Sequence, residues 1–252
     1  MNVNKTLALS MLTLSVYAIS LPSVADEAKY IAKAPIIDGV ASESEWQTGE
    51  WYPLNQDLIG GLPEATDFSG SYTLRWDNDY LYLLARITDD VMYDQHPNPL
   101  HFYWDDDCLE IFIDEDASGG NHLFTYNAFA YHIALDNQAV DIGPKSSDGS
   151  MNFVLLNDHI TSAWKRGSEP DHQITWEVAI KIFDDSYTDT GTHKPVSLTA
   201  NKKLGFMLAY CDNDGSENRE NFIGSHPIEP VNGDKNLGYI DASVFDSLTL
   251  VK

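Results

Sequence analysis

The sequence predicts an all-β protein, a two-sheet antiparallel β-sandwich of jelly-roll-like form with few short helices. In residues 175–182 every second side chain is large and apolar, the period of a strand with one buried face. Other β-rich runs cover residues 81–87, 108–113, 123–135, 204–210 and 247–251. Turn-forming Gly, Asn and Asp separate these runs, and only residues 42–47 resemble a short helix, with Ser42 as its cap. Strands that follow one another without helical crossovers favour antiparallel sheets.

The N-terminal segment has the pattern of a secretory signal peptide. Lys5 is followed by a mostly apolar run over residues 7–21, and small residues precede a cleavage position after Ala25. This run is shorter than the roughly 20 residues that a membrane-spanning helix needs, and no comparable run follows. We therefore expect residues 1–25 to be removed, residues 26–252 to form one domain, and the protein to be secreted or periplasmic.

The composition excludes two classes of partner. Asp and Glu total 39 against 15 Lys and Arg, a net charge of −24. Such a surface repels nucleic acid and anionic lipid. Disorder does not fit a chain that is 43% hydrophobic and 12% aromatic. The negative charge therefore indicates a solubilising surface, binding sites for hard cations, or both. We also expect the protein to be a monomer.

The two cysteines, Cys108 and Cys211, both lie in apolar stretches. In an exported chain they form either a disulfide or two buried thiols, and the sequence leaves both open. Neither has a nearby His or a CxxC partner, so the sequence does not predict a cysteine metal site or nucleophile.

Four segments, in order and spacing, resemble carbohydrate-binding module family 9, in the wider group of DOMON-like sandwiches. They are APIIDG at 34–39 with Trp46 after it, LRWDNDYLY at 74–82 ending in TDD at 88–90, WDDDCLEIFID at 104–114, and GF at 205–206 leading to DNDG at 212–215. The resemblance covers about residues 29–252. It implies a β-sandwich, structural calcium, and recognition of sugar, often the end of a glucan or xylan chain.

Sugars offer C–H patches on their faces and hydroxyls at their edges, so their sites combine flat aromatic rings with polar groups. The resemblance implies that Trp104 stacks on the sugar and that Tyr239 supplies a second ring, where the best-known members carry Trp. Tyr offers less surface, which favours weaker affinity or a different sugar. The alternative for Trp104 is a core aromatic. We assign Trp46, Trp76 and Trp176 to the core and leave Trp51 and Trp164 unassigned.

The resemblance places four polar side chains beside those rings: Glu110, His132, Arg219 and Asn236. The planar fork of Arg219 can donate to two adjacent hydroxyls, although a surface ion pair with Glu217 or Glu220 is the alternative. Glu110 is either a sugar acceptor or a calcium ligand. The best-known members carry Arg where His132 aligns, and a buried core histidine is its alternative.

Calcium takes six to eight oxygen ligands, and four aspartates at strand ends are the candidates. They are Asp89, Asp90, Asp107 and Asp114. Solvated acidic loops are the alternative for each. The DNDG turn at 212–215 lacks the later Glu of an EF-hand, so we interpret it as a β-turn, with calcium as the less favoured interpretation.

Three other functions compete with non-catalytic binding of a glucan- or xylan-derived saccharide. A glycoside hydrolase would use two carboxylates such as Asp106 and Glu110, but no wider catalytic signature accompanies them. A haem-b-binding electron-transfer domain would draw its ligands from Met92, Met207, His101 and His132. A structural or partner-binding module would show no sugar response. We predict the binding protein.

Overall fold

The computed structural model describes residues 25–168 and 172–252, so all but the last residue of the predicted signal peptide lies outside the described residues. The described chain forms strands and three short 3-10 helices. The strands are β1 (Asp26–Tyr30), β2 (Tyr52–Leu54), β3 (Gln56–Ile59), β4 (Phe68–Trp76), β5 (Leu81–Asp89), β6 (Cys108–Asp114), β7 (Phe129–Ala134), β8 (Ala139–Gly143), β9 (Asn152–Leu155), β10 (Ile160–Arg166), β11 (Gln173–Ile180), β12 (Lys203–Asp212), β13 (Asn221–Gly224) and β14 (Asp246–Val251). The helices are η1 (Ser44–Trp46), η2 (Tyr103–Asp105) and η3 (Ala242–Val244).

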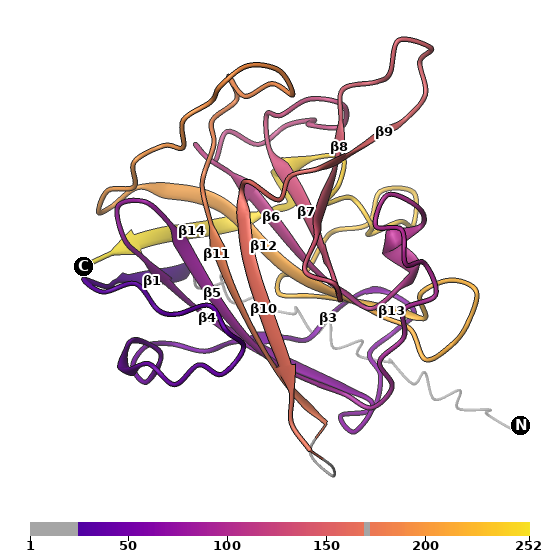
Figure 1. Cartoon of the computed structure of the whole chain (residues 1–252). Coiled ribbons are helices and arrows are strands. Elements are labelled where there is room, and N and C mark those ends of the chain that lie inside the picture. Colours follow the sequence, from indigo (N-terminus) through magenta and orange to yellow (C-terminus); the bar gives the residue numbers. More distant parts are fainter. Residues whose placement is uncertain (1–24, 169–171) are drawn as a thin grey trace, which may run out of the picture.

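The strands form one strongly curled sheet whose two halves pack face to face as a β-sandwich (Figure 1). The strand order is β10-β11-β5-β4-β1-β14-β12-β6-β7-β8-β9, with β2 on β4, β13 on β12 and β3 on β13. The all-β sandwich is therefore confirmed, but the sheet is mixed. β1 pairs in parallel with both β4 and β14 and joins two antiparallel halves. Because long stretches of chain separate β1 from both partners, no hairpin forces an antiparallel pairing.

The half that contains β6, β7 and β12 is buried on both faces. Leu109 and Ile111 of β6 face the main core, which they share with Leu74 and Trp176 of the other half. The alternate β6 residues face the opposite side, where a second apolar cluster includes Cys108, Phe112, Met207, Cys211 and Phe222. Since side chains alternate along a strand, this outer face receives the even-numbered residues of β6.

Most sequence-predicted elements match the structure within about two residues. The exception is the run at 123–135, because β7 begins only at Phe129. Before it the chain turns, with the Thr125 N–H donating to the His122 carbonyl at 2.9 Å and Phe124 in the left-handed region at φ 68°. Ser42 is not a cap either: η1 begins at Ser44, and Glu43 precedes it without a side-chain cap. Trp46, Trp76 and Trp176 are buried, as predicted.

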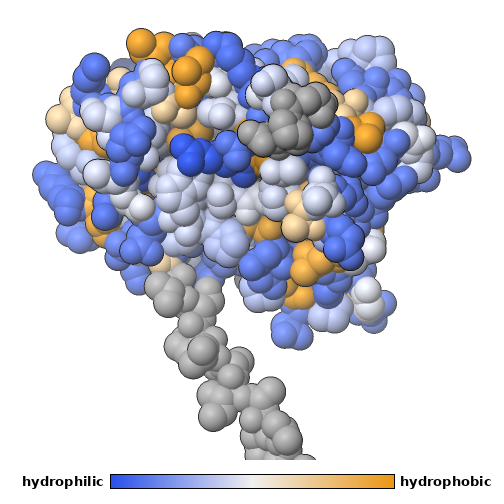
Figure 2. All heavy atoms as spheres, turned by 90° about the horizontal axis from the view of Figure 1, so that it is seen from below, coloured by the Kyte–Doolittle hydropathy of each residue, from blue (hydrophilic) through white to orange (hydrophobic). Residues whose placement is uncertain are grey.

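The surface is largely hydrophilic, in line with the strong negative charge of the sequence. Figure 2 shows one face of the molecule, on which hydrophobic atoms form small separate patches among polar ones. Within the described ranges, no helix is long and apolar enough to cross a membrane.

Candidate functional site

A cavity of about 470 Å³ opens on the outer face of the half that contains β6 and β7. Its floor comes from β6, β7 and β8, and its walls from η2, the start of β9, the segment before β13 and the loop that follows β13. In Figure 1, η2 lies beside the C-terminal loops at the edge of the molecule. The lining residues are Ile59, Tyr103, Trp104, Asp105, Glu110, His132, Ile142, Met151, Phe153, Asn218, Arg219, Asn236 and Tyr239. All six side chains that the family resemblance suggests for the sugar site are in this set.

Trp104 lies at the wall of the cavity and not in the core. Its indole is half-buried and packs edge-on against Phe102 and Tyr103, with ring centroids 5.5 and 5.0 Å away. Phe153 packs obliquely on it at 5.8 Å. These three neighbours hold the indole in place while leaving part of it exposed to the cavity.

Tyr239 is also half-buried and packs against the second apolar cluster. The preceding residue, Gly238, allows the loop to approach this cluster closely. A Cβ atom at Gly238 would lie 2.6 Å from the Phe112 ring and 2.8 Å from Met207. Only glycine fits there without displacing its neighbours, so the close approach of the backbone sets where the Tyr239 phenol lies.

Glu110 and His132 form the polar floor of the cavity. They occupy opposite positions on β6 and β7, and Glu110 Oε1 lies 2.8 Å from His132 Nε2. Both side chains are buried, and Nδ1 of His132 has no hydrogen-bond partner. His132 is therefore not a satisfied core histidine, and the floor keeps an unused polar atom.

Arg219 turns inward to the cavity. Its Nη1 donates to Cys211 Sγ at 3.0 Å, and its guanidinium lies 4.2 Å from the centroid of the Phe222 ring. Burial alone would lower the pKa of Arg219, but its contact with Cys211 and the negative charge of Glu110 raise it, so the group stays cationic. The predicted alternative, a surface ion pair with a neighbouring Glu, does not describe this arrangement.

A network of polar contacts holds the η2 wall against the Arg219 wall. The amide of Asn213, which is fully buried, donates to the Asp105 carbonyl at 2.6 Å and to the Ser216 carbonyl at 3.1 Å. Oδ1 of Asp105 accepts the Arg219 backbone N–H at 3.2 Å. The DNDG segment leaves the end of β12 in a bend, in which Asn213 Oδ1 accepts the backbone N–H groups of Gly215 and Ser216, and it connects the two walls of the cavity.

Sequence reasoning missed about half of the cavity lining. Tyr103 and Asp105 flank Trp104 in the chain, so the acidic turn itself pointed to them. Met151 lies just before β9 and Phe153 is the second residue of β9, so these two alternate residues both face the cavity. That alternation was visible in the sequence, but nothing in it showed that β9 borders the same face as β6.

A second polar region lies where β5 and β12 end and β6 begins. Carboxylate oxygens of Asp89, Asp107 and Asp212 all lie within 4.8 Å of one another, and all three residues are buried. Tyr210 donates to Asp89 Oδ2 at 2.6 Å, and the backbone N–H of Asn213 donates to Asp107 Oδ1 at 2.8 Å. Oδ1 of Asp89 and Oδ1 of Asp212 have no partner.

These three carboxyls are costly to ionise in this place. Burial, followed by the charge of neighbouring carboxylates, raises the pKa of Asp107 to about 9 and that of Asp212 to about 8. Burial also raises the pKa of Asp89 to about 6, against the hydrogen bond from Tyr210. A cation among them would remove that cost, and two unpaired oxygens are free to bind it.

The other two predicted calcium residues lie elsewhere. Asp90 belongs to a neighbouring, more exposed group with Asp67 and Asp214. Asp114 is at the far end of β6, roughly 20 Å along the strand from Asp107. Its carboxylate accepts the Gly119 N–H at 2.7 Å and so supports a turn. The prediction that Asp114 binds calcium together with the other three aspartates is therefore wrong, because opposite ends of one strand cannot share an ion.

The residues that a glycoside hydrolase or a haem-binding domain would need do not come together in the cavity. Asp106 lies outside it and accepts the backbone N–H groups of Gln95 and His96 at 2.9 and 3.1 Å. Of the four candidate haem ligands only His132 lines the cavity. Met207 is in the second apolar cluster, Met92 packs against the main core, and His101 is exposed.

The chain matches a family model along most of its length. Residues 37–252 fit the model described as "Carbohydrate family 9 binding domain-like". The chain belongs to this family. The family 9 domain is also 25% identical over 220 residues to endo-1,4-beta-xylanase A of Thermotoga maritima, and 30% identical over 220 residues to that of Thermotoga neapolitana. In each case the match covers 86% of this chain and 17% of the xylanase.

Solved structures share the fold of this family 9 domain. A carbohydrate-binding module of family 9 from Caldicellulosiruptor kristjanssonii in complex with glucose superposes with a TM-score of 0.61 at 16% identity, covering 89% of this chain and 95% of that one. A family 9 module from the same organism in complex with cellotriose gives a TM-score of 0.60 at 17% identity, covering 90% of this chain and 93% of that one. At such identities the likeness establishes the fold.

Proposed function

We propose that this family 9 domain binds a glucose- or xylose-based saccharide in the cavity between Trp104 and Tyr239, without cleaving it. The observation that carries the proposal is one cavity in which two partly exposed aromatic rings face a polar floor. Its volume of about 470 Å³ lies in the range of small-molecule sites. Family 9 modules solved in complex with glucose and with cellotriose support this class of ligand.

The aromatic rings supply the affinity in this proposal. The faces of a pyranose present C–H groups, which pack on the flat ring systems of Trp104 and Tyr239. Such ring contacts contribute about 1 kcal/mol each beyond the buried area. The apolar side chains of Met151 and Phe153 extend the wall beyond Trp104 and offer a surface to a second sugar unit.

The polar groups set the orientation of the sugar. Glu110 accepts from a hydroxyl, while Arg219 and the Asn236 amide donate to others. The unpartnered Nδ1 of His132 takes one more hydroxyl. Since a buried polar atom without a partner costs free energy, a sugar that satisfies it gains specificity over one that does not.

The proposal excludes hydrolysis as the role of this chain. Glycosidases need two carboxylates on opposite sides of the scissile bond. Glu110 lines the cavity, but the carboxylate of Asp106 lies outside it and is already occupied by two backbone N–H groups. We assign the hydrolase activity named for the xylanases to the parts of those proteins that this chain does not match.

We propose calcium as a structural ion between Asp89, Asp107 and Asp212. The donor set fits a hard cation, because it consists of carboxylate oxygens, two of them unpartnered. The ion would cancel repulsion between the ends of three strands from both halves of the sandwich. Asp67, Asp90 and Asp214 offer oxygens for a second, more exposed ion.

We also propose that the protein is exported, because its N-terminal segment has the pattern of a secretory signal peptide.

Titration calorimetry of the mature chain against a panel of sugars tests the binding role. Glucose, cellotriose, xylose and xylotriose should give at least one saturable, equimolar isotherm, and galactose serves as the hydroxyl-inverted control. Chromatography after prolonged incubation with the same oligosaccharides should show no shorter products. Absence of binding to every sugar, or the appearance of cleavage products, contradicts the proposal.

A further inference from the structure

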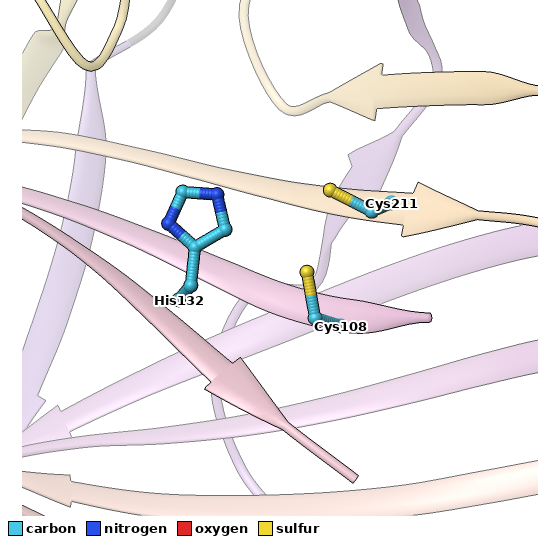
Figure 3. Close-up of side chains that lie close together, drawn as sticks. All are labelled: Cys108, His132 and Cys211. Atoms are coloured by element: carbon cyan, nitrogen blue, oxygen red, sulfur yellow. The ribbon is translucent and has the colours of Figure 1, made fainter. Parts of the chain in front are cut away.

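Two cysteines lie close to the histidine of the cavity floor. Cys108 and Cys211 occupy opposite positions on β6 and β12, and His132 comes from the neighbouring β7. Their two Sγ atoms and one imidazole nitrogen all lie within 4.8 Å of one another. Figure 3 shows both sulfur atoms and one ring nitrogen facing a common space. Both thiols are free and buried.

Glu110 completes a set of four donors. It is two residues after Cys108 on β6, so both side chains point to the same face. Its Oε1 lies 2.8 Å from His132 Nε2, and its Oε2 lies 4.0 Å from Cys211 Sγ. On the next strand the small Ala209 lies opposite Glu110 and leaves room for these side chains.

The donors suit zinc in type and spacing. Thiolate sulfur and imidazole nitrogen are its preferred ligands, and four-coordinate zinc places its ligand atoms roughly 3.3–3.8 Å apart. The two sulfurs and the ring nitrogen lie within 4.8 Å of one another, and Glu110 lies 2.8 Å from His132 and 4.0 Å from Cys211, so rotations of the side chains toward one another would complete a tetrahedron.

The local charges balance for a divalent ion. Two thiolates and the Glu110 carboxylate give −3, Arg219 beside Cys211 gives +1, and Zn²⁺ brings the sum to zero. A buried site with no net charge avoids an uncompensated ion in a medium of low dielectric constant. A monovalent ion such as Cu⁺ would leave −1, so the charges favour zinc.

We propose that Cys108, Cys211, His132 and Glu110 form a zinc site at the floor of the saccharide cavity. The sequence did not predict it, because His132 is 24 positions after Cys108 and only the register of β6 and β7 brings them together. Without metal, burial raises the pKa of the Cys108 thiol and keeps it protonated. On binding, both S–H bonds break, two protons leave to solvent, and the ion takes the two thiolates. The site shares Glu110 and His132 with the proposed saccharide cavity, but metal binding is measured without any sugar, so either proposal can fail while the other holds.

Cobalt(II) is the probe, since it replaces zinc and reports thiolate ligands by colour. Metal-free protein, kept under reductant without oxygen and with two thiols verified by a thiol reagent, is titrated with Co²⁺. We expect a sulfur-to-cobalt charge-transfer band in the near ultraviolet that saturates at one equivalent and disappears when Zn²⁺ is added. In weak buffer, about two protons should be released per Zn²⁺.

Variants separate this site from adventitious binding. C108S and C211S should each lose the band, and His132→Gln should weaken cobalt binding at least tenfold, while the matched control His96→Gln should bind as the wild type does. If a cysteine variant fails to fold by circular dichroism, His132→Gln decides. The proposal is overturned if folded, reduced wild-type protein gives no such band. It is also overturned if the band persists in folded cysteine variants, or if His132→Gln binds cobalt as tightly as the wild type does.

Discussion

Phe153 of β9 packs against Trp104 of η2 with ring centroids 5.8 Å apart and planes inclined by 48°. The contact joins two segments nearly 50 residues apart and fixes one side of the proposed stacking platform. Because Trp104 keeps an exposed part toward the cavity, its replacement should affect ligand binding more than folding.

We expect Trp104→Ala to weaken saccharide binding roughly tenfold or more, since a stacked ring contributes about 1 kcal/mol beyond its buried area. Calorimetry with the tightest sugar of the panel measures the loss, and thermal unfolding checks the fold. Trp51→Ala is the control, because Trp51 is 36% exposed and lies outside the cavity. Unchanged affinity in Trp104→Ala would remove the indole from the site.

We expect Tyr239→Trp to strengthen binding several-fold. The indole covers more of a pyranose face than the phenol does. Tyr239→Ala should weaken binding, so the two variants should move affinity in opposite directions. Equal affinities for all three proteins in calorimetry would show that this ring does not touch the ligand.

Much of the fold could be predicted from the sequence, because the period-two alternation of a strand is a local pattern. That alternation in β6 places Cys108, Glu110 and Phe112 on one face and Leu109 and Ile111 on the other, before any tertiary contact is known. The ordered family segments then pointed to six residues that share one cavity. The parallel pairing of β1 was not predictable in the same way, because it depends on strands distant in the chain.

Long-range register explains what was missed. Asp212 joins Asp89 and Asp107 because β12 ends where β6 begins, whereas Asp114 was chosen only for its place at a strand end. Similarly, Phe153 reaches the cavity through the β8–β9 pairing. Which end of which strand meets another is decided by pairing and curl, and residue types alone do not encode it.

We expect calcium removal to destabilise the domain. If the ion at Asp89, Asp107 and Asp212 is present at 100 times its Kd, it contributes about 2.7 kcal/mol, which corresponds to about 5–10 °C in Tm for a domain of this size. Thermal unfolding with calcium and with excess chelator measures the difference. Restoring calcium to the chelated protein should restore the higher Tm.

Substitutions distinguish the proposed calcium ligands from Asp114, which lies at the other end of β6. Asp107→Asn and Asp212→Asn should each lose most of the calcium-dependent rise in Tm. Asp114→Asn should keep it, whatever its own stability, because that carboxylate supports the turn at Gly119. A calcium response that vanishes in Asp114→Asn and persists in Asp107→Asn would reverse this assignment.

His159 gives a prediction about pH. It is buried, its Nδ1 lies 2.9 Å from the Tyr131 hydroxyl, and it stacks on Phe183 with ring centroids 4.0 Å apart. Burial, with the positive charge of Lys181, lowers its pKa from 6.5 to about 4. A lowered histidine pKa means that the unfolded chain binds the proton first. Stability from this group is therefore present above pH 6.5 and is lost as pH falls toward 4, by about 3 kcal/mol.

Urea unfolding at a series of pH values between 4 and 7 tests this in wild type and His159→Gln. Glutamine stays neutral and can still accept from Tyr131, so the variant should lose less stability on acidification. The gap between the two proteins should shrink, or change sign, as pH falls. His101→Gln, at an exposed loop position, should follow the wild-type curve. Parallel curves for wild type and His159→Gln would mean that another group governs acid sensitivity.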